Sequence, residues 1–252
     1  LNGALEPLLG TLVPELSNND SIVVDLNPAA RWSDGKPVNS NDVKYIFTKG
    51  SVSTVEQIAD IHVDTLYEAS ADTTAPKKMK GERLSFMVAK DKRNNPLSVM
   101  DLLQAIRIVP SHVFAELEKQ HGDVAEVKKL MLDKNPLDGK PPVVSGPYNL
   151  KDYSSTKIIL QRRDDYWGNA ALHEGKLPAP KYIVHPIYKS NEHSTIAMRE
   201  GNLDASMSFI PRIERKAISG IHTWYDQAPY FVPGAMPMLF ISCNQEDEIA
   251  SE

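Results

Sequence analysis

Alternating and helical patterns of apolar residues divide the chain into short strands and helices. Alternation with a period of two predicts strands, and apolar residues three and four positions apart predict helices. The predicted strands cover residues 21–26, 83–89, 148–153, 157–161, 182–188 and 203–206. The predicted helices cover residues 39–50, 95–106, 113–120 and 190–200, and residues 1–16 are predicted to form a short helix and a loop. Ser190–Asn191 is predicted to cap the last of these helices and Gly201 to end it. Strand, helix and strand follow one another over residues 182–206, which is the span of a right-handed βαβ crossover.

The stretch from Ser145 to Gly168 has the most regular pattern. Its sequence, SGPYNLKDYSSTKIILQRRDDYWG, begins with a glycine–proline turn signal and continues as two strand-like runs. The two serines at 154–155 suit the turn between the runs. Tyr166 and Trp167 close the stretch, and we interpret both large rings as packing residues.

A helix start is predicted at Asn39, which is a good N-cap residue. Asp42 follows three positions later, where its carboxylate can reach back to the cap or favour the helix dipole. Gly50 is a natural stop for this helix. Trp32 lies just before it and allows two interpretations, a ligand platform or an anchor in the core or hinge. The usual burial of tryptophan favours the anchor.

Composition narrows the class of protein without identifying it. A chain of 252 residues can form one large domain or two small ones. The net charge of −5 is mixed in sign, which argues against a nucleic-acid binder with a basic stripe. No run of about 18 apolar residues is present, so we expect no membrane span. The single cysteine, Cys243, allows no internal disulfide and no thiolate metal cluster, and we expect it to be a small buried apolar residue.

No catalytic motif is present, and we predict no catalytic residue, no metal site and no cofactor. His185 and His193 flank a turn beside Glu192, but a metal or acid–base site needs converging ligands. We therefore favour surface polar residues at a helix start. Asp164 and Asp165 are adjacent, and neighbours in a strand point to opposite faces, so we do not expect them to share a proton.

Six residues are candidates for ligand binding. Aromatic side chains are dense between residues 221 and 231, and such rings can stack on sugars or pack on peptide side chains. In open α/β sheets, ligands lie beyond the carboxyl ends of the strands, which directs attention to the residues after 203–206. The candidates are Trp224, Tyr225, Tyr230, Phe209, Ser206 and Ser208. For each aromatic residue the alternative, a place in the core, stays open.

Three stretches of the chain match known sequence signatures. SGPYNLKDY…IILQRRDDYWG over Ser145–Gly168 resembles GTGPYkL…i.leRNpdYWg. ARWSDGKPV with Asn41–Val43 resembles kWSDGkPvtAeDV, and Met198–Asp204 resembles l.aGevD. These are signatures of the family 5 extracellular solute-binding proteins, the oligopeptide, dipeptide, nickel and oligosaccharide receptors of bacterial ABC importers, which the chain therefore resembles. The motifs occur in the order of the family, and the resemblance covers nearly the whole chain.

The resemblance implies an α/β fold, a lobe like those of type II periplasmic binding proteins with a smaller inserted α+β domain. It places residues 1–16 and 143–238 in the first lobe, residues 17–142 in the inserted domain, and residues 239–252 at the start of a second lobe that is missing. Family members are about twice as long, so we expect this chain to be a fragment, with an export signal upstream. A fragment without the second lobe is expected to bind ligand weakly.

The resemblance also implies a function. Such a protein captures an oligopeptide or oligosaccharide outside the cytoplasmic membrane, in the periplasm or as a surface lipoprotein, and delivers it to ABC permease subunits. It is implied to be a monomer and not an enzyme, with no nucleic-acid partner and membrane contact only through a permease or a lipid anchor. The stretches at 189–206 and 223–231 favour the cello-oligosaccharide branch. The alternatives are an oligosaccharide-processing, glycoside hydrolase-like enzyme and a peptide receptor, in which Asp204 or Asp226 would meet a peptide terminus.

Overall fold

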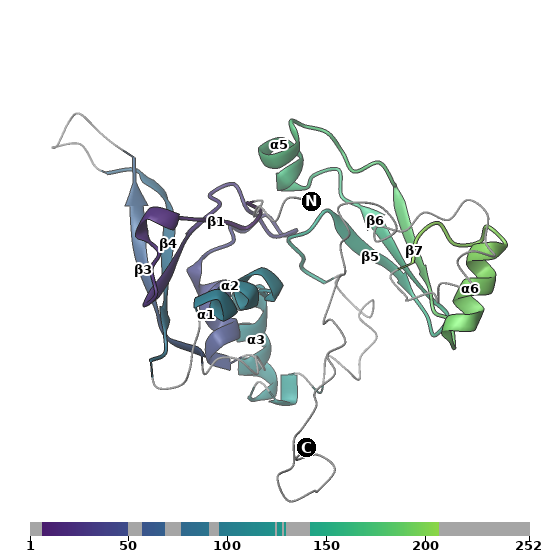
Figure 1. Ribbon diagram of the computed structural model, residues 1–252, viewed down its shortest axis with the longest axis horizontal. Helices are drawn as coiled ribbons and strands as arrows, with labels where there is room; N and C mark the ends of the chain where they lie inside the picture. The colour runs from purple at the N-terminus through teal and green to yellow at the C-terminus, as the bar shows by residue number, and fades with distance from the viewer. Residues whose placement is uncertain are drawn as a thin grey trace, which may run out of the picture. The chain divides into compact units, whose positions relative to one another are not determined.

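The computed structural model describes residues 7–49, 57–68, 77–90, 96–123, 125–127, 129 and 142–206 (Figure 1). The chain divides into two compact units. One unit is Leu5–Ile187, and the other combines Leu1–Ala4 with Tyr188–Glu252. The domain boundaries derived from the sequence stay a prediction.

The first sheet of the larger unit has four antiparallel strands in the order β1-β2-β4-β3. They are β1 (Gly10–Leu12), β2 (Ser21–Leu26), β3 (Ile58–Tyr67) and β4 (Met79–Val88). The strands predicted at 21–26 and 83–89 are thus confirmed, although β4 begins earlier. The helix predicted within residues 1–16 is wrong at residues 10–12. There the backbone pairs with β2. The pairing needs glycine at position 10, because a Cβ atom there would lie 2.6 Å from Val24 Cγ1.

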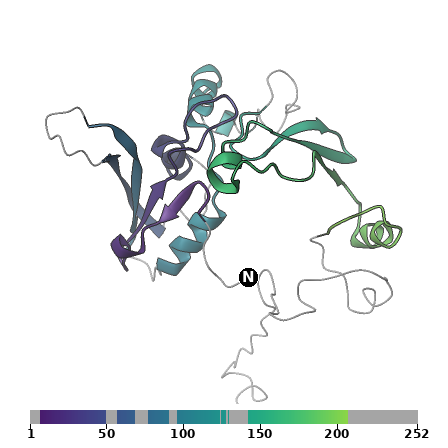
Figure 2. The same cartoon turned by 90° about the horizontal axis from the view of Figure 1, so that it is seen from above.

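The helices of this part are α1 (Ser40–Lys49), α2 (Pro96–Ala105) and α3 (Ser111–His121), with a short 3-10 helix, η1 (Pro14–Leu16). The helices predicted at 39–50, 95–106 and 113–120 are therefore confirmed to within a few residues. Figures 1 and 2 show α1 and α2 beside the four-stranded sheet. None of the helices in the described parts of the chain is long and apolar enough to cross a membrane.

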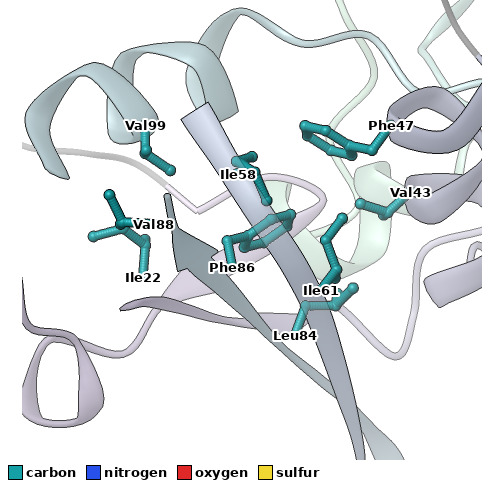
Figure 3. Packing of buried hydrophobic residues seen from close by; sticks show 9 residues of the cluster. All are labelled: Ile22, Val43, Phe47, Ile58, Ile61, Leu84, Phe86, Val88 and Val99. Atoms are coloured by element: carbon teal, nitrogen blue, oxygen red, sulfur yellow. The ribbon is translucent and has the colours of Figure 1, made fainter. Parts of the chain in front are cut away.

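The core lies between one face of this sheet and the helices. Alternate residues of the strands point toward α1 and α2, as expected for a sheet that is covered on one side. Nine buried side chains form the cluster (Figure 3): Ile22, Val43, Phe47, Ile58, Ile61, Leu84, Phe86, Val88 and Val99. The rings of Phe47 and Phe86 meet at a tilt, with centroids 5.7 Å apart.

The second sheet has three antiparallel strands in the order β5-β6-β7. They are β5 (Tyr148–Tyr153), β6 (Lys157–Arg162) and β7 (Tyr182–Pro186). The predicted hairpin is confirmed. Its turn is closed by Ser154, whose N–H donates to the Lys157 carbonyl at 2.9 Å and whose Oγ accepts from the Lys157 N–H at 3.2 Å.

The helix α5 (Trp167–His173) follows β6 and is not among the helices predicted from the sequence. It begins at Trp167, one of the two aromatic residues predicted to pack. Gly168 is required in its first turn because a Cβ atom there would lie 2.4 Å from the Tyr166 ring. The helix ends where Glu174 adopts a left-handed conformation with φ 54°.

The smaller unit contains α6 (Asn191–Arg199). The predicted cap is confirmed, because Ser190 Oγ accepts from the His193 N–H at 3.4 Å. Gly201, predicted to end the helix, has a positive φ of 75°. The strand predicted at 203–206 is wrong, and so is the βαβ crossover that depended on it. In the described parts of the chain these residues belong to no strand and to neither sheet.

Removing the Leu84 side chain should test the core. Leu84 has no exposed surface, so Leu84→Ala leaves a cavity and should lower the free energy of unfolding by about 2–5 kcal/mol. The matched control is Leu16→Ala, whose leucine is 46% exposed and whose loss should cost within about 0.5 kcal/mol. Urea unfolding followed by circular dichroism measures both. Equal losses in the two variants would contradict this core.

Candidate functional site

The six candidate ligand residues fall almost entirely outside the described structure. Ser206 is half-buried at the end of the described part of the smaller unit and has an interaction partner. The other five, Ser208, Phe209, Trp224, Tyr225 and Tyr230, lie in residues 207–252, outside the described residues. All six therefore stay predictions.

Trp32 is a buried anchor, as the burial argument favoured. Only 3% of it is exposed, and its indole Nε1 donates to Asp42 Oδ2 at 2.9 Å. With Ala30 and Val38 it forms a second small apolar cluster. A ligand platform would need an open ring face, so the platform interpretation of Trp32 is wrong.

The Asp42 carboxylate is a buried charged group with hydrogen bonds to both of its oxygens. It is 1% exposed and accepts four hydrogen bonds. Oδ2 accepts from the Trp32 indole and from the Asn39 N–H at 3.0 Å. Oδ1 accepts from the Ser111 N–H at 2.8 Å and from the Ser111 hydroxyl at 2.7 Å. Four donors offset the desolvation of a buried charge.

This arrangement brings two helix starts to one carboxylate. At α1 the predicted cap is confirmed, because Asn39 Oδ1 accepts from the Asn41 N–H at 2.9 Å while Asp42 reaches back to the Asn39 N–H. At α3 the same carboxylate accepts from Ser111, the first residue of the helix. A negative charge at both N-termini also favours both helix dipoles.

Asp34 and His112 form a second, more exposed contact between the turn that follows Trp32 and the start of α3. His112 Nε2 lies 2.7 Å from Asp34 Oδ2, and the Lys36 N–H donates to Asp34 Oδ1 at 3.2 Å. Burial alone would raise the pKa of Asp34. The hydrogen bond from His112, the Lys36 N–H and the nearby positive charges outweigh burial and lower that pKa below its ordinary value.

The adjacent carboxylates Asp164 and Asp165 are not a catalytic pair. Asp164 Oδ1 accepts from Arg162 Nε at 2.9 Å, and Asp165 Oδ1 accepts from Arg163 Nε at 3.3 Å. Each carboxylate is thus directed to an arginine of its own. The expectation that they do not share a proton agrees with this geometry.

The histidine pair offers no converging ligands. His185 is exposed on β7, and His193 is exposed at the start of α6, where its Nδ1 lies 3.3 Å from Ser190 Oγ. Within the described ranges no group of three histidine, cysteine or acidic side chains could hold a metal ion. The exposure of both histidines agrees with their interpretation as surface polar residues.

Tyr166 and Trp167 pack as the sequence predicted. Tyr166 is buried, and its ring centroid lies 5.2 Å from that of Trp167. Burial raises the pKa of the Tyr166 phenol, against the charge of Arg163. The Trp167 indole donates to the Ser145 carbonyl at 3.0 Å, which fixes the start of the hairpin.

Asp42→Asn should show how far the fold depends on this carboxylate. An amide offers one acceptor atom to four donors and turns its own N–H groups toward some of them. We expect the free energy of unfolding to fall by about 3 kcal/mol. Asp20→Asn, at an exposed carboxylate 3.2 Å from Lys90, is the matched control and should change it by within about 0.5 kcal/mol. Urea denaturation measures the free energy of unfolding of both variants. An unchanged value in Asp42→Asn would show that the fold does not need this network.

The Asp34–His112 contact predicts that the free energy of unfolding falls in acid. Because the folded-state pKa of Asp34 is lowered, its stabilisation is present above the unfolded aspartate pKa of about 3.9 and is lost as the pH falls through the folded value. Asp34→Asn keeps the oxygen that accepts from Lys36 but loses the charge. The difference in free energy of unfolding between parent and variant, measured by urea denaturation, should therefore be larger at about pH 6 than at about pH 3. A gap that does not change with pH would refute the assignment.

Comparison with known proteins assigns the chain to a family. The sequence model described as "Bacterial extracellular solute-binding proteins, family 5 Middle" matches residues 4–249. A probable peptide-binding protein YejA of Agrobacterium fabrum is 25% identical over 180 residues, covering 71% of this chain and 26% of the relative. The peptidoglycan-binding protein YepA of the same organism is 28% identical over 171 residues, covering 66% of this chain and 23% of the relative.

A solved structure supports the same assignment. It is a periplasmic oligopeptide-binding protein of an oligopeptide ABC transporter from Thermotoga maritima, bound to mannohexaose. The TM-score is 0.61 at 25% identity, and the match covers 90% of this chain and 38% of that one. The mixed helix and sheet fold is similar to type II periplasmic binding proteins, and this chain spans only part of the length of its relatives. Because the family model matches nearly every residue, the chain belongs to the family 5 bacterial extracellular solute-binding proteins.

Proposed function

We propose that this chain is part of the substrate-binding component of an ABC importer. The observation that carries the proposal is the family match over residues 4–249. The protein would capture an oligopeptide or an oligosaccharide outside the cytoplasmic membrane and deliver it to permease subunits. Its place would be the periplasm or the cell surface, either free or tethered by a lipid, and it would work as a monomer without a cofactor.

The names of the relatives support a ligand that is a short polymer. They refer to peptides for YejA, to peptidoglycan for YepA and to mannohexaose for the Thermotoga maritima protein. Both ligand chemistries expose apolar faces beside polar edges, which aromatic side chains bind well. We therefore keep peptide and sugar as the two candidate classes. No specific observation favours the glycoside hydrolase-like alternative, and the proposal assigns no catalytic residue.

The proposed ligand contacts are the six residues named from the sequence. Trp224, Tyr225 and Tyr230 would supply stacking surfaces, with Phe209 as a further apolar contact. The hydroxyl groups of Ser206 and Ser208 would supply hydrogen bonds, as in sites that combine apolar walls with a few placed polar groups. The chemistry of these side chains supports the assignment.

The proposed organisation places this site in a first lobe of residues 1–16 and 143–238, with residues 17–142 as an inserted domain. Residues 239–252 would begin a second lobe. Ligand capture would then use closure of two lobes around the ligand. The similarity to the Thermotoga maritima protein over 90% of this chain is compatible with that organisation.

A thermal-shift screen of the full-length protein tests the proposal. Cello-, manno- and xylo-oligosaccharides would be compared with di- to pentapeptides. A ligand that binds only the native state at about 100 times its dissociation constant adds about 2.7 kcal/mol, which raises the melting temperature. We expect a shift with one class, and we expect it to be lost in a Trp224→Ala/Tyr225→Ala variant.

The matched control is Tyr153→Phe, at an exposed tyrosine of β5 outside the proposed site, which should keep the full shift. A shift with peptides alone would discard the sugar preference but support the receptor function. The absence of any shift across both libraries would count against the proposed function.

A further inference from the structure

The paired ends of β3 and β4 extend beyond the rest of the first sheet. The pairing of β2 with β4 stops at Arg83, whereas the pairing of β3 with β4 continues until Tyr67 lies opposite Met79. Figures 1 and 2 show this end of the two-stranded ribbon pointing away from the helices that cover the sheet. The name ribbon tip is used below for five residues of this end: Tyr67, Lys77, Lys78, Met79 and Lys80.

The ribbon tip exposes two large apolar side chains next to each other. Tyr67 is 50% exposed and Met79 is 54% exposed, and the two residues are partners in the strand register. Neither belongs to one of the two buried clusters of the described structure. Water solvates such side chains poorly, and the tyrosine ring with its hydroxyl suits a boundary between apolar and aqueous surroundings.

Three lysines accompany this apolar pair. Lys77, Lys78 and Lys80 are all exposed, and Lys77 Nζ lies 5.8 Å from the centroid of the Tyr67 ring. A lysine side chain can lay its aliphatic stem along an apolar surface while its ammonium group stays in a polar layer. The ribbon tip thus combines apolar side chains with positive charge.

The neighbouring acidic side chains offset little of this charge. Glu68 Oε1 lies 3.0 Å from Lys78 Nζ, but the lysine is 77% exposed and the glutamate 50% exposed, and such surface pairs are weak. Glu82 Oε2 accepts from the Ser40 N–H at 2.7 Å, which directs that carboxylate to the start of α1. The whole chain has a net charge of −5, so a negatively charged surface would attract the ribbon tip and repel much of the remainder.

We propose that the ribbon tip docks on the anionic phospholipid surface of a membrane. The lysine ammonium groups pair with headgroup phosphates, and Tyr67 and Met79 enter the boundary between headgroups and acyl chains. Lysines that only protect the edge strand β3 from pairing with other strands would not need the apolar pair. The setting rests on the proposed function, because a receptor that delivers its ligand to a permease works beside a membrane.

Vesicle flotation of the full-length protein, without any lipid modification, tests the positive charge of this docking surface. Vesicles of phosphatidylcholine would be compared with vesicles of equal parts phosphatidylcholine and phosphatidylglycerol, in the absence of a transport ligand. We expect flotation only with the anionic vesicles, and less of it as salt is added. Lys77→Gln with Lys80→Gln should lower the partition coefficient about twentyfold, because each lysine near an anionic surface contributes about fivefold.

The matched control is Lys119→Gln with Lys176→Gln. These lysines are 76% and 79% exposed and lie outside the ribbon tip. The control removes the same total charge, but charges beyond the screening length of the surface contribute little, so the partition coefficient should stay within about twofold of the parent value.

Met79→Ser tests the apolar part of the docking surface. It should lower the partition coefficient about fivefold at both low and high salt, because the insertion of an apolar side chain is not screened by ions. Leu8→Ser, at a leucine that is also 54% exposed but outside the ribbon tip, should keep the parent value. An unchanged melting temperature would show that each variant is folded.

Three results would overturn the docking surface. They are no flotation of the parent with anionic vesicles, equal flotation with both kinds of vesicle, and equal losses in the two double-lysine variants. A ribbon tip that binds a protein partner instead would give the first of these results. Because no transport ligand is used, each of them would leave the proposed receptor function standing.

Discussion

The described structure depends most on the buried carboxylate of Asp42. A charge placed in the interior is tolerated only where donors surround it, and here the donors come from three separate segments. They fix the indole of Trp32, the first turn of α1 and the first turn of α3 relative to one another. Since α1 also contributes Val43 and Phe47 to the core of the first sheet, one polar centre and one apolar core position the same helix from two sides.

The contacts of Asp42 also position the residues that follow Trp32 in the chain. Once Trp32 is held, the turn that follows it presents Ser33 to Val144 and Asp34 to His112. The first contact continues into the hairpin that carries the aromatic signature of the family. The motifs that identify the family in this sequence, at Trp32 and at Tyr166–Trp167, are thus used here for packing and bonding. They identify the fold more directly than they identify a ligand.

The proposed ligand contacts are different residues from those that identify the family. The described residues around Asp42 form a buried network of hydrogen bonds, and the proposed ligand contacts begin at Ser206. This separation has a physical reason. A buried network is most stable when every donor and acceptor is bonded, whereas a ligand site must keep some of its donors, acceptors and ring faces open. A receptor with a rigid scaffold can vary its ligand by changing side chains outside that network.

The sequence by itself determined the local features: the cap of Asn39 and Asp42, the Ser154 turn, the cap at Ser190 and the stop at Gly201. Each depends on bonds between residues a few positions apart, so spacing and residue type are sufficient to predict it. Only the tertiary structure decided that Asp42 also bonds Ser111, that Ser33 bonds Val144, that residues 10–12 form a strand and that residues 203–206 do not. Those outcomes depend on partners that the chain brings together from a distance, and a strand or a buried charge is stable only when that partner is present.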